Sequence, residues 1–129
     1  MKIAQVCPYD FSRHGGVKTH ILQLSDALRK LGHEVHIIAP TGAETVHLTN
    51  FHPFGRNFSI PFLGTKIDIN AALGSEKKRL KNFLKDEAFD LIHFHTIWNP
   101  ILPFQILSLS KTKRVSTFHD TPKNNWVGR

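Results

Sequence analysis

A regular spacing of apolar residues between positions 17 and 31 predicts an amphipathic helix. These residues recur at steps of four, three, four and three, which places them on one helix face: Val17, Ile21, Leu24, Leu28 and Leu31. Arg29 and Lys30 fall in the last turn, where cations favour the helix dipole. Gly32 can turn left-handed, so the pattern predicts a helix over residues 17–31 that ends there.

Short apolar stretches on both sides of this helix predict two strands. Residues 2–7 (KIAQVC) precede the helix and residues 33–40 (HEVHIIAP) follow it. A β-α-β crossover is right-handed and brings the second strand beside the first in the same direction. We therefore expect these two strands to pair in parallel.

The middle of the chain is less regular. Residues 46–51 and 58–62 predict short β pieces, because proline and glycine interrupt the segments around them. Residues 75–86 predict another amphipathic helix. Its apolar stripe is narrow and basic residues take the other positions; the stripe consists of Leu80, Phe83 and Leu84.

The last part of the chain predicts two more strands with a helix between them. Residues 89–94 (FDLIHF) form the nearly continuous apolar run of a strand that is covered on both faces. Asn99 and Pro100 supply an N-cap and a first-turn proline for a helix to residue 110, and residues 113–118 predict the next strand. This alternation indicates an α/β fold with a Rossmann-like, doubly wound parallel sheet.

The Gly15-Gly16 pair between the first strand and the first helix is a candidate ligand contact. Glycine permits positive φ and close approach of the backbone, and a first helical turn offers unpaired N–H groups and the positive end of a dipole. Such a position suits a phosphate or another anion. Because no P-loop or Gly-x-Gly-x-x-Gly spacing is present, a plain tight turn remains the alternative.

Ligands of doubly wound sheets bind beyond the carboxyl ends of the strands. The loops at residues 8–16, 95–99 and 119–125 should converge there. His119, at the tip of its strand, is a candidate to hydrogen-bond a ligand hydroxyl or to carry a proton. His93 and His95 share a strand face, but two ligands do not make a metal site. We therefore predict no metal, and expect His93 to be a hydrogen-bonded core residue.

Composition indicates one compact domain in 129 residues, large enough to bury its own core. The single cysteine, Cys7, excludes an internal disulfide and is expected to be a small buried side chain. The chain contains neither a signal-peptide core nor an apolar run of spanning length. We expect a cytoplasmic protein.

The charge is unevenly distributed. Seventeen Lys and Arg residues against ten Asp and Glu give +7. The predicted second helix holds a basic cluster, which includes Lys77, Lys78, Arg79 and Lys81. Such a cluster attracts anionic surfaces such as phospholipid head groups, and a solvated helix face is the alternative. No nucleic-acid-binding motif accompanies the charge, so nucleic acid is not an expected partner.

The sequence resembles the N-terminal domain of the GT-B-fold, family 4 retaining glycosyltransferases. The resemblance rests on VCPYDFSRHGGVKTHILQLSDALRKLGHEVHIIAP, FDLIHFH and VSTFHDTP, and within the family it is most like phosphatidylinositol mannosyltransferases and related lipid-modifying enzymes. It implies transfer of a hexose from a nucleotide sugar to a lipid or saccharide acceptor, with retention and without a cofactor or catalytic metal. The N-terminal domain of such enzymes mainly holds the acceptor.

The resemblance also implies roles for individual residues. The amides of Gly15 and Gly16 would approach the donor phosphate, and His119 would contact the transferred sugar as a catalytic residue. Asn99 and Lys123 would help to bind an acceptor phosphate, and Tyr9 lies among the polar residues of the same crevice. The segment from Lys77 to Lys81 matches the region that docks such enzymes peripherally on the inner face of a membrane.

Two departures qualify this expectation. The lipid-modifying relatives have an acidic residue where this chain has Ser12 and Arg13, which leaves the acceptor's identity open. The chain also stops at Arg129, so we expect a partial domain, without the donor-binding domain and inactive by itself. The alternative is a non-catalytic Rossmann-like module that binds a phosphorylated ligand or a separate donor subunit.

Overall fold

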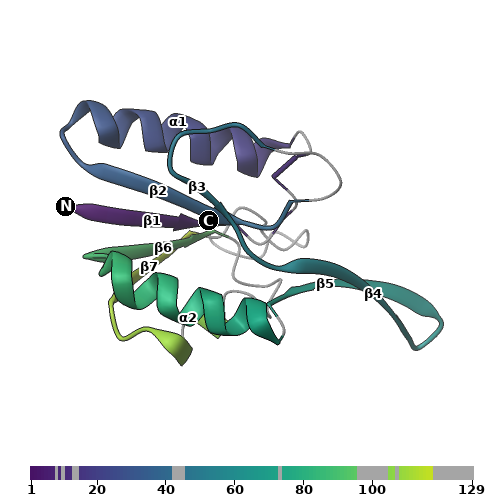
Figure 1. Ribbon diagram of the computed structural model, residues 1–129. Helices are drawn as coiled ribbons and strands as arrows, with labels where there is room; N and C mark the ends of the chain where they lie inside the picture. The colour runs from purple at the N-terminus through teal and green to yellow at the C-terminus, as the bar shows by residue number, and fades with distance from the viewer. Residues whose placement is uncertain are drawn as a thin grey trace, which may run out of the picture.

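The computed structural model describes residues 1–7, 9, 11–12, 15–41, 46–72, 74–95, 105–106 and 108–117 (Figure 1). Two helices and seven strands are defined within these residues. In chain order they are β1 (Lys2–Val6), α1 (Gly16–Lys30), β2 (Glu34–Ala39), β3 (Phe51–Pro53), β4 (Arg56–Phe62), β5 (Thr65–Ala71), α2 (Ser75–Glu87), β6 (Leu91–His95) and β7 (Lys113–Thr117).

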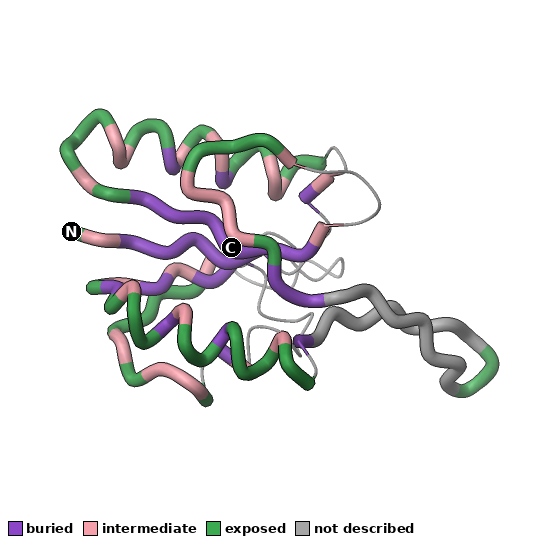
Figure 2. The backbone as a smooth tube through the Cα atoms, viewed as in Figure 1, coloured by how far each residue is buried: buried purple, intermediate pink, exposed green. Residues whose placement is uncertain are grey.

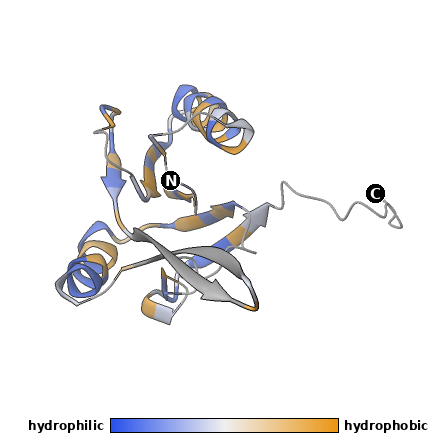
Figure 3. Cartoon of the chain, turned by 90° about the vertical axis from the view of Figure 1, so that its right-hand side faces the viewer, coloured by the Kyte–Doolittle hydropathy of each residue, from blue (hydrophilic) through white to orange (hydrophobic). Residues whose placement is uncertain are grey.

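Five of the strands form one parallel sheet in the order β3-β2-β1-β6-β7. The helices α1 and α2 lie on opposite faces of this sheet (Figure 3). The central strand β1 pairs with β2 and β6, as expected for the strands of two crossover units. The predicted Rossmann-like, doubly wound α/β fold is therefore confirmed.

The sheet has a hydrophobic core on each face, and Figure 2 shows its central strands as largely buried. Side chains alternate along a strand, so neighbouring residues belong to different cores. On the α2 face, Leu80 and Phe94 are part of the larger cluster. On the α1 face, Ile21 and Ile37 pack with Cys7, which is 1% exposed as expected of a small buried side chain.

The helix α1 agrees with the predicted helix to within one residue at each end. Ile21 is fully buried, and Val17, Leu24 and Leu28 are half-buried. Leu31 does not belong to the buried stripe, because it lies just after the helix and is 75% exposed. Gly32 has φ 97°, the left-handed conformation that ends the helix as predicted.

The middle of the chain differs most from the prediction. Residues 46–50 do not form a strand, and β3 begins only at Phe51. β4 and β5 pair as an antiparallel hairpin that projects from the main sheet (Figure 1). Leu63 and Gly64 connect them with φ values of 50° and 81°, both positive as a type I′ turn requires.

The described residues between 75 and 117 follow the predicted order of elements. The stripe of α2 is confirmed, because Leu80 and Leu84 are buried and Phe83 packs beside them. β6 begins two residues later than the predicted 89–94, at Leu91. Residues 105–106 and 108–109 are helical, and the rest of the predicted helix lies largely outside the described residues. β7 begins at Lys113 as predicted and is described to Thr117, and the predicted last residue, Phe118, lies outside the described residues.

Candidate functional site at the carboxyl edge of the sheet

The loop after β1 and the start of α1 meet at the carboxyl edge, the edge of the sheet where its parallel strands end (Figure 1). The described part of this edge includes Tyr9, Gly15 and Gly16. The predicted site residues Asn99, His119 and Lys123 lie outside the described residues. The structure therefore describes the glycine pair and the strand ends, while the roles of the site residues stay predictions.

Gly15 and Gly16 do not need the conformational freedom of glycine. Gly15 is extended, with φ 174° and ψ 161°, and Gly16 is the first residue of α1. Neither residue has the left-handed, positive φ that glycine permits. A Cβ atom added at either residue would meet nothing within 4 Å, so the backbone faces open space. Glycine at these two positions leaves the backbone accessible to another molecule.

The first turn of α1 has an electropositive, uncapped end. Gly15 makes no side-chain cap hydrogen bond, and no acidic residue lies in the first turn. The Thr19 hydroxyl and amide both donate to the Gly15 carbonyl, at 3.0 and 3.1 Å. The Lys18 ammonium lies 5.3 Å from the centre of the Phe11 ring and adds a positive charge. This end of the helix suits an anion.

Phe11 anchors the loop that carries Tyr9. Its ring is fully buried and stacks on Phe51 at 5.4 Å, and its amide donates to the Pro40 carbonyl at 2.8 Å. Tyr9 packs against the same core, and its carbonyl accepts a hydrogen bond from the Cys7 thiol at 3.7 Å. Burial raises the pKa of Cys7 from 9.0 to about 12, so this thiol is not a nucleophile near neutral pH.

A row of polar side chains crosses the sheet beneath α1. His95 Nε2 lies 2.6 Å from Gln5 Oε1, and both residues are fully buried. His93 Nε2 lies 2.6 Å from Thr117 Oγ1, so His93 is hydrogen-bonded as predicted, but it is only partly buried and is not a core residue. The two rings stack at 4.1 Å, so they share a face as predicted. His20 of α1 meets His95 edge-on at 5.7 Å.

The basic cluster predicted on the second helix lies on α2. Lys77, Lys78, Arg79 and Lys81 are all exposed, in the half of α2 nearer the carboxyl edge. The side of α2 that faces away from the sheet is hydrophilic (Figure 3). Arg79 is also part of the fold, because its guanidinium lies 4.3 Å from the centre of the buried Phe54 ring. The lysines are therefore the better probes of surface charge.

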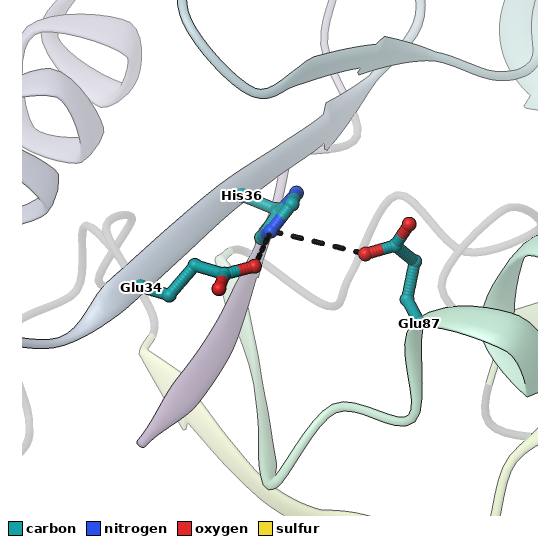
Figure 4. Close-up of side chains that lie close together, drawn as sticks. All are labelled: Glu34, His36 and Glu87. Carbon is teal, nitrogen blue, oxygen red and sulfur yellow. Dashed lines mark hydrogen bonds and ion pairs between the residues drawn. The ribbon is translucent and has the colours of Figure 1, made fainter.

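Sequence reasoning missed a second polar cluster at the opposite, amino edge of the sheet, where the strands begin. Glu34 and His36 of β2 meet Glu87, the last residue of α2 (Figure 4). The Lys2 ammonium lies 2.8 Å from Glu87 and 3.7 Å from Glu34. The hydrogen bond to Lys2 lowers the pKa of Glu87, and the one to His36 lowers the pKa of Glu34. In the sequence, only the i, i+2 spacing of Glu34 and His36 indicates this cluster.

The missed residues at the carboxyl edge carry weak sequence signals. Lys18 follows the glycine pair by two positions, and Phe11 is an apolar residue inside an otherwise polar loop. Gln5 is a polar residue at a core position of a strand, which indicates a buried hydrogen-bonding partner. That partner, His95, lies ninety residues further along the chain and only the fold identifies it.

A comparison with known protein families identifies the family of this domain. The family model described as Glycosyltransferase Family 4 matches residues 14–129, which includes the glycine pair, α2 and the whole of the parallel sheet after β1. The chain belongs to glycosyltransferase family 4. The resemblance seen in the sequence is thus confirmed for this family 4 domain.

Curated relatives of this family 4 domain are phosphatidyl-myo-inositol mannosyltransferases. The protein of that name from Mycobacterium tuberculosis H37Rv is 33% identical over 119 residues, covering 92% of this chain and 31% of the relative. The one from Mycolicibacterium smegmatis is also 33% identical, and the one from Propionibacterium freudenreichii is 35% identical over 126 residues and 33% of its length. The chain spans about a third of the relatives that it matches.

Within the described residues, no helix of this family 4 domain is both long enough and apolar enough to cross a bilayer.

Proposed function

We propose that this chain is the acceptor-binding part of a retaining glycosyltransferase that transfers a hexose from a nucleotide sugar to a lipid acceptor. The observation that carries the proposal is the uncapped first turn of α1 at the carboxyl edge of a family 4 sheet. Open space faces Gly15 and Gly16, and Lys18 in the same first turn carries a positive charge, which lies over the Phe11 ring. A phosphate group of a substrate fits these donors.

The names of the relatives favour a particular class of acceptor. They are phosphatidyl-myo-inositol mannosyltransferases, and the name describes transfer of mannose to a phosphorylated polyol head group. For this chain we propose an acceptor of the same chemistry, an anionic glycerophospholipid with a polyol head group. Asn99 and Lys123 are proposed to hold its phosphate, Tyr9 to line the crevice, and His119 to hydrogen-bond the transferred sugar as the catalytic residue.

A lipid acceptor requires the enzyme to reach a membrane surface. We propose that the exposed lysines of α2 supply this contact, because Lys77, Lys78 and Lys81 present positive charge to solvent on one segment. Each basic residue near an anionic bilayer contributes about 1 kcal/mol at physiological ionic strength. The protein would then bind peripherally to the inner face of a cytoplasmic membrane.

Backbone NMR of the labelled chain tests the phosphate contact. Pyrophosphate, standing for the diphosphate of the donor, should shift the amide signals of Gly15, Gly16 and Lys18. Gly16→Pro removes one amide donor but is compatible with the fold, because proline suits the first helical position and Gly15 is already extended. It should weaken binding about tenfold, the scale of one lost hydrogen bond to a charged group.

Gly16→Ala is the matched control, since it keeps the amide and its Cβ meets nothing within 4 Å. It should bind pyrophosphate as the unchanged chain does. Inositol 1-phosphate, which stands for the acceptor head group, should bind to the unchanged chain. Lys123→Met should bind it more weakly, and Lys111→Met should bind it as tightly as the unchanged chain does. Failure of both ligands to give saturable shifts at the carboxyl edge would overturn the proposed function.

A further inference from the structure

The polar cluster at the amino edge brings three potential metal ligands together. The Nε2 atom of His36 lies 2.5 Å from Glu34 Oε2 and 3.9 Å from Glu87 Oε1. One ligand atom from each residue fits within 4.8 Å of the others (Figure 4). Two elements contribute, because Glu34 and His36 belong to β2 and Glu87 ends α2. The cluster therefore links the sheet to the helix that covers it.

The shortest contact in this cluster requires a positive centre. An imidazole nitrogen and a carboxylate oxygen both carry lone pairs, so they approach to 2.5 Å only with an electrophile between them. A proton fills that position when Nε2–H of His36 donates to Glu34. A metal ion can fill the same position when Nε2 is unprotonated and coordinates the metal.

The neighbours of His36 favour coordination through Nε2. Its Nδ1 atom lies 2.9 Å from Nε2 of His52, which can accept an Nδ1 proton and leave the Nε2 lone pair facing the carboxylates. Metal-binding histidines are commonly held in this way by a second hydrogen bond. The His36 ring is also buried, with Phe89 edge-on at 5.3 Å. Its orientation is therefore fixed on several sides.

Lys2 is the positive charge that now balances the two carboxylates. Its ammonium contacts Glu87 and Glu34, and its side chain is 27% exposed. A lysine at the sheet edge can move its head group into water while its stem stays packed. A divalent ion would then replace the ammonium and interact with the same two oxygens at shorter range.

We propose that Glu34, His36 and Glu87 bind a divalent ion of the zinc class. One imidazole with two carboxylates suits zinc, whereas magnesium and calcium prefer oxygen ligands alone. Ligands of tetrahedral zinc lie about 3.3 Å apart, given bonds of about 2.0–2.1 Å. The two contacts of His36 Nε2, now 2.5 and 3.9 Å, therefore bracket the required separation.

The site would be structural, because it lies at the edge of the sheet opposite the glycine loop (Figure 1). Bound zinc would cross-link β2 to the end of α2 and raise the stability of the α2 face. This zinc site does not depend on the proposed glycosyl transfer.

The Lys2→Met variant removes the competing ammonium without removing a ligand.

Titration calorimetry of the chelator-treated, tag-free chain with zinc tests the site, together with thermal unfolding with and without zinc. We expect saturable binding of one ion per chain and a higher melting temperature. Glu34→Gln keeps the size of an exposed side chain and should weaken binding at least about tenfold, and Glu87→Gln should do the same. Lys2→Met should bind zinc more tightly than the unchanged chain.

Two matched controls separate this site from adventitious binding. Glu76→Gln removes an acidic side chain from the same helix outside the cluster, and His47→Gln removes an exposed histidine. Neither should change the affinity. The proposal is overturned if the unchanged chain does not bind zinc saturably, or if Glu34→Gln and Glu87→Gln bind as tightly as these controls while circular dichroism shows all variants folded.

Discussion

His95 and Gln5 form a fully buried hydrogen bond, 2.6 Å between Nε2 and Oε1, that joins the last residue of β6 to the carboxyl end of β1. Gln5 offers only an acceptor at Oε1, so the ring nitrogen of His95 donates. The same ring stacks on His93 and meets His20 of α1. The end of β6 is thus held by the central strand and by the helix that starts at the glycine pair.

Substitution of His95 by leucine should destabilise the fold by about 1–3 kcal/mol, because the buried Gln5 carbonyl loses its hydrogen bond. The Gln5 Nε2 atom has no hydrogen-bond partner among the described residues, so the amide depends on this one contact. Urea unfolding measures the change. In the double variant with Gln5→Leu, the loss should be smaller than the sum of the single losses, and additive losses would contradict the coupling.

The parallel sheet and its helices could be predicted from local patterns. The i, i+3, i+4 spacing of Val17 and Ile21 onward identified α1, and the flanking apolar strands followed from the crossover rule. The prediction failed at Leu31, where the periodicity continued one position past the helix into its exposed end. An apolar residue at the right spacing is buried only if the helix still reaches it.

The hairpin of β4 and β5 was only partly predicted. Residues 58–62 were expected as a β piece, but β5 was missed although KIDIN alternates apolar and polar residues with period two. Leu63-Gly64 is not one of the usual turn pairs, so the turn signal was weak. Leucine adopts positive φ there because the antiparallel pairing of the two strands determines the turn.

The candidate sites differ in how far sequence could locate them. The glycine loop was found because a strand, a glycine pair and a helix follow one another along the chain. The amino-edge cluster of Glu34, His36 and Glu87 could not be found in the sequence, because Glu87 reaches β2 only through the packing of α2 on the sheet. Lys2 joins the cluster through strand register, since it pairs with Glu34 across β1 and β2.

Ala88→Gly should stabilise the chain by about 0.5–1 kcal/mol, because residues with a Cβ atom are strained in the left-handed conformation. Ala88 ends α2 with φ 49° and ψ 58° and is exposed, so little packing is lost. Ala27→Gly, at an exposed position inside α1, should destabilise the chain by about 1 kcal/mol. Denaturant midpoints that move in the same direction for both would contradict the structure.

Cys7 should make the stability decrease at alkaline pH. Burial raises its pKa from 9.0 to about 12, so the folded chain keeps the thiol proton in a range where the unfolded chain loses it. The contribution is complete below pH 9.0 and is lost between pH 9.0 and about 12, at up to about 1.4 kcal/mol per pH unit. Cys7→Ala should show a shallower decrease in the free energy of unfolding, and parallel curves would exclude this role.

The chain tested alone should transfer no hexose. It spans about a third of the relatives that it matches, and catalysis of transfer requires both substrates to be held together. A panel of nucleoside-diphosphate hexoses with phosphatidylinositol vesicles should give no glycolipid detectable by mass spectrometry. Turnover of any of these donors by the purified 129-residue chain would refute this expectation.

The exposed lysines of α2 should determine binding to anionic membranes. Replacement of Lys77, Lys78 and Lys81 by serine removes three charges and should weaken binding to phosphatidylinositol-containing vesicles by about 3 kcal/mol at most. Arg79 is kept because its guanidinium packs on Phe54, so that the fold is not disturbed.

The control variant replaces three exposed lysines outside α2 and changes the net charge equally; these are Lys30, Lys111 and Lys113. Vesicle sedimentation should show a much larger loss for the α2 variant, and rising salt should reduce that difference because exposed charges are screened. Equal losses in the two variants would reduce the cluster to a solvated helix face.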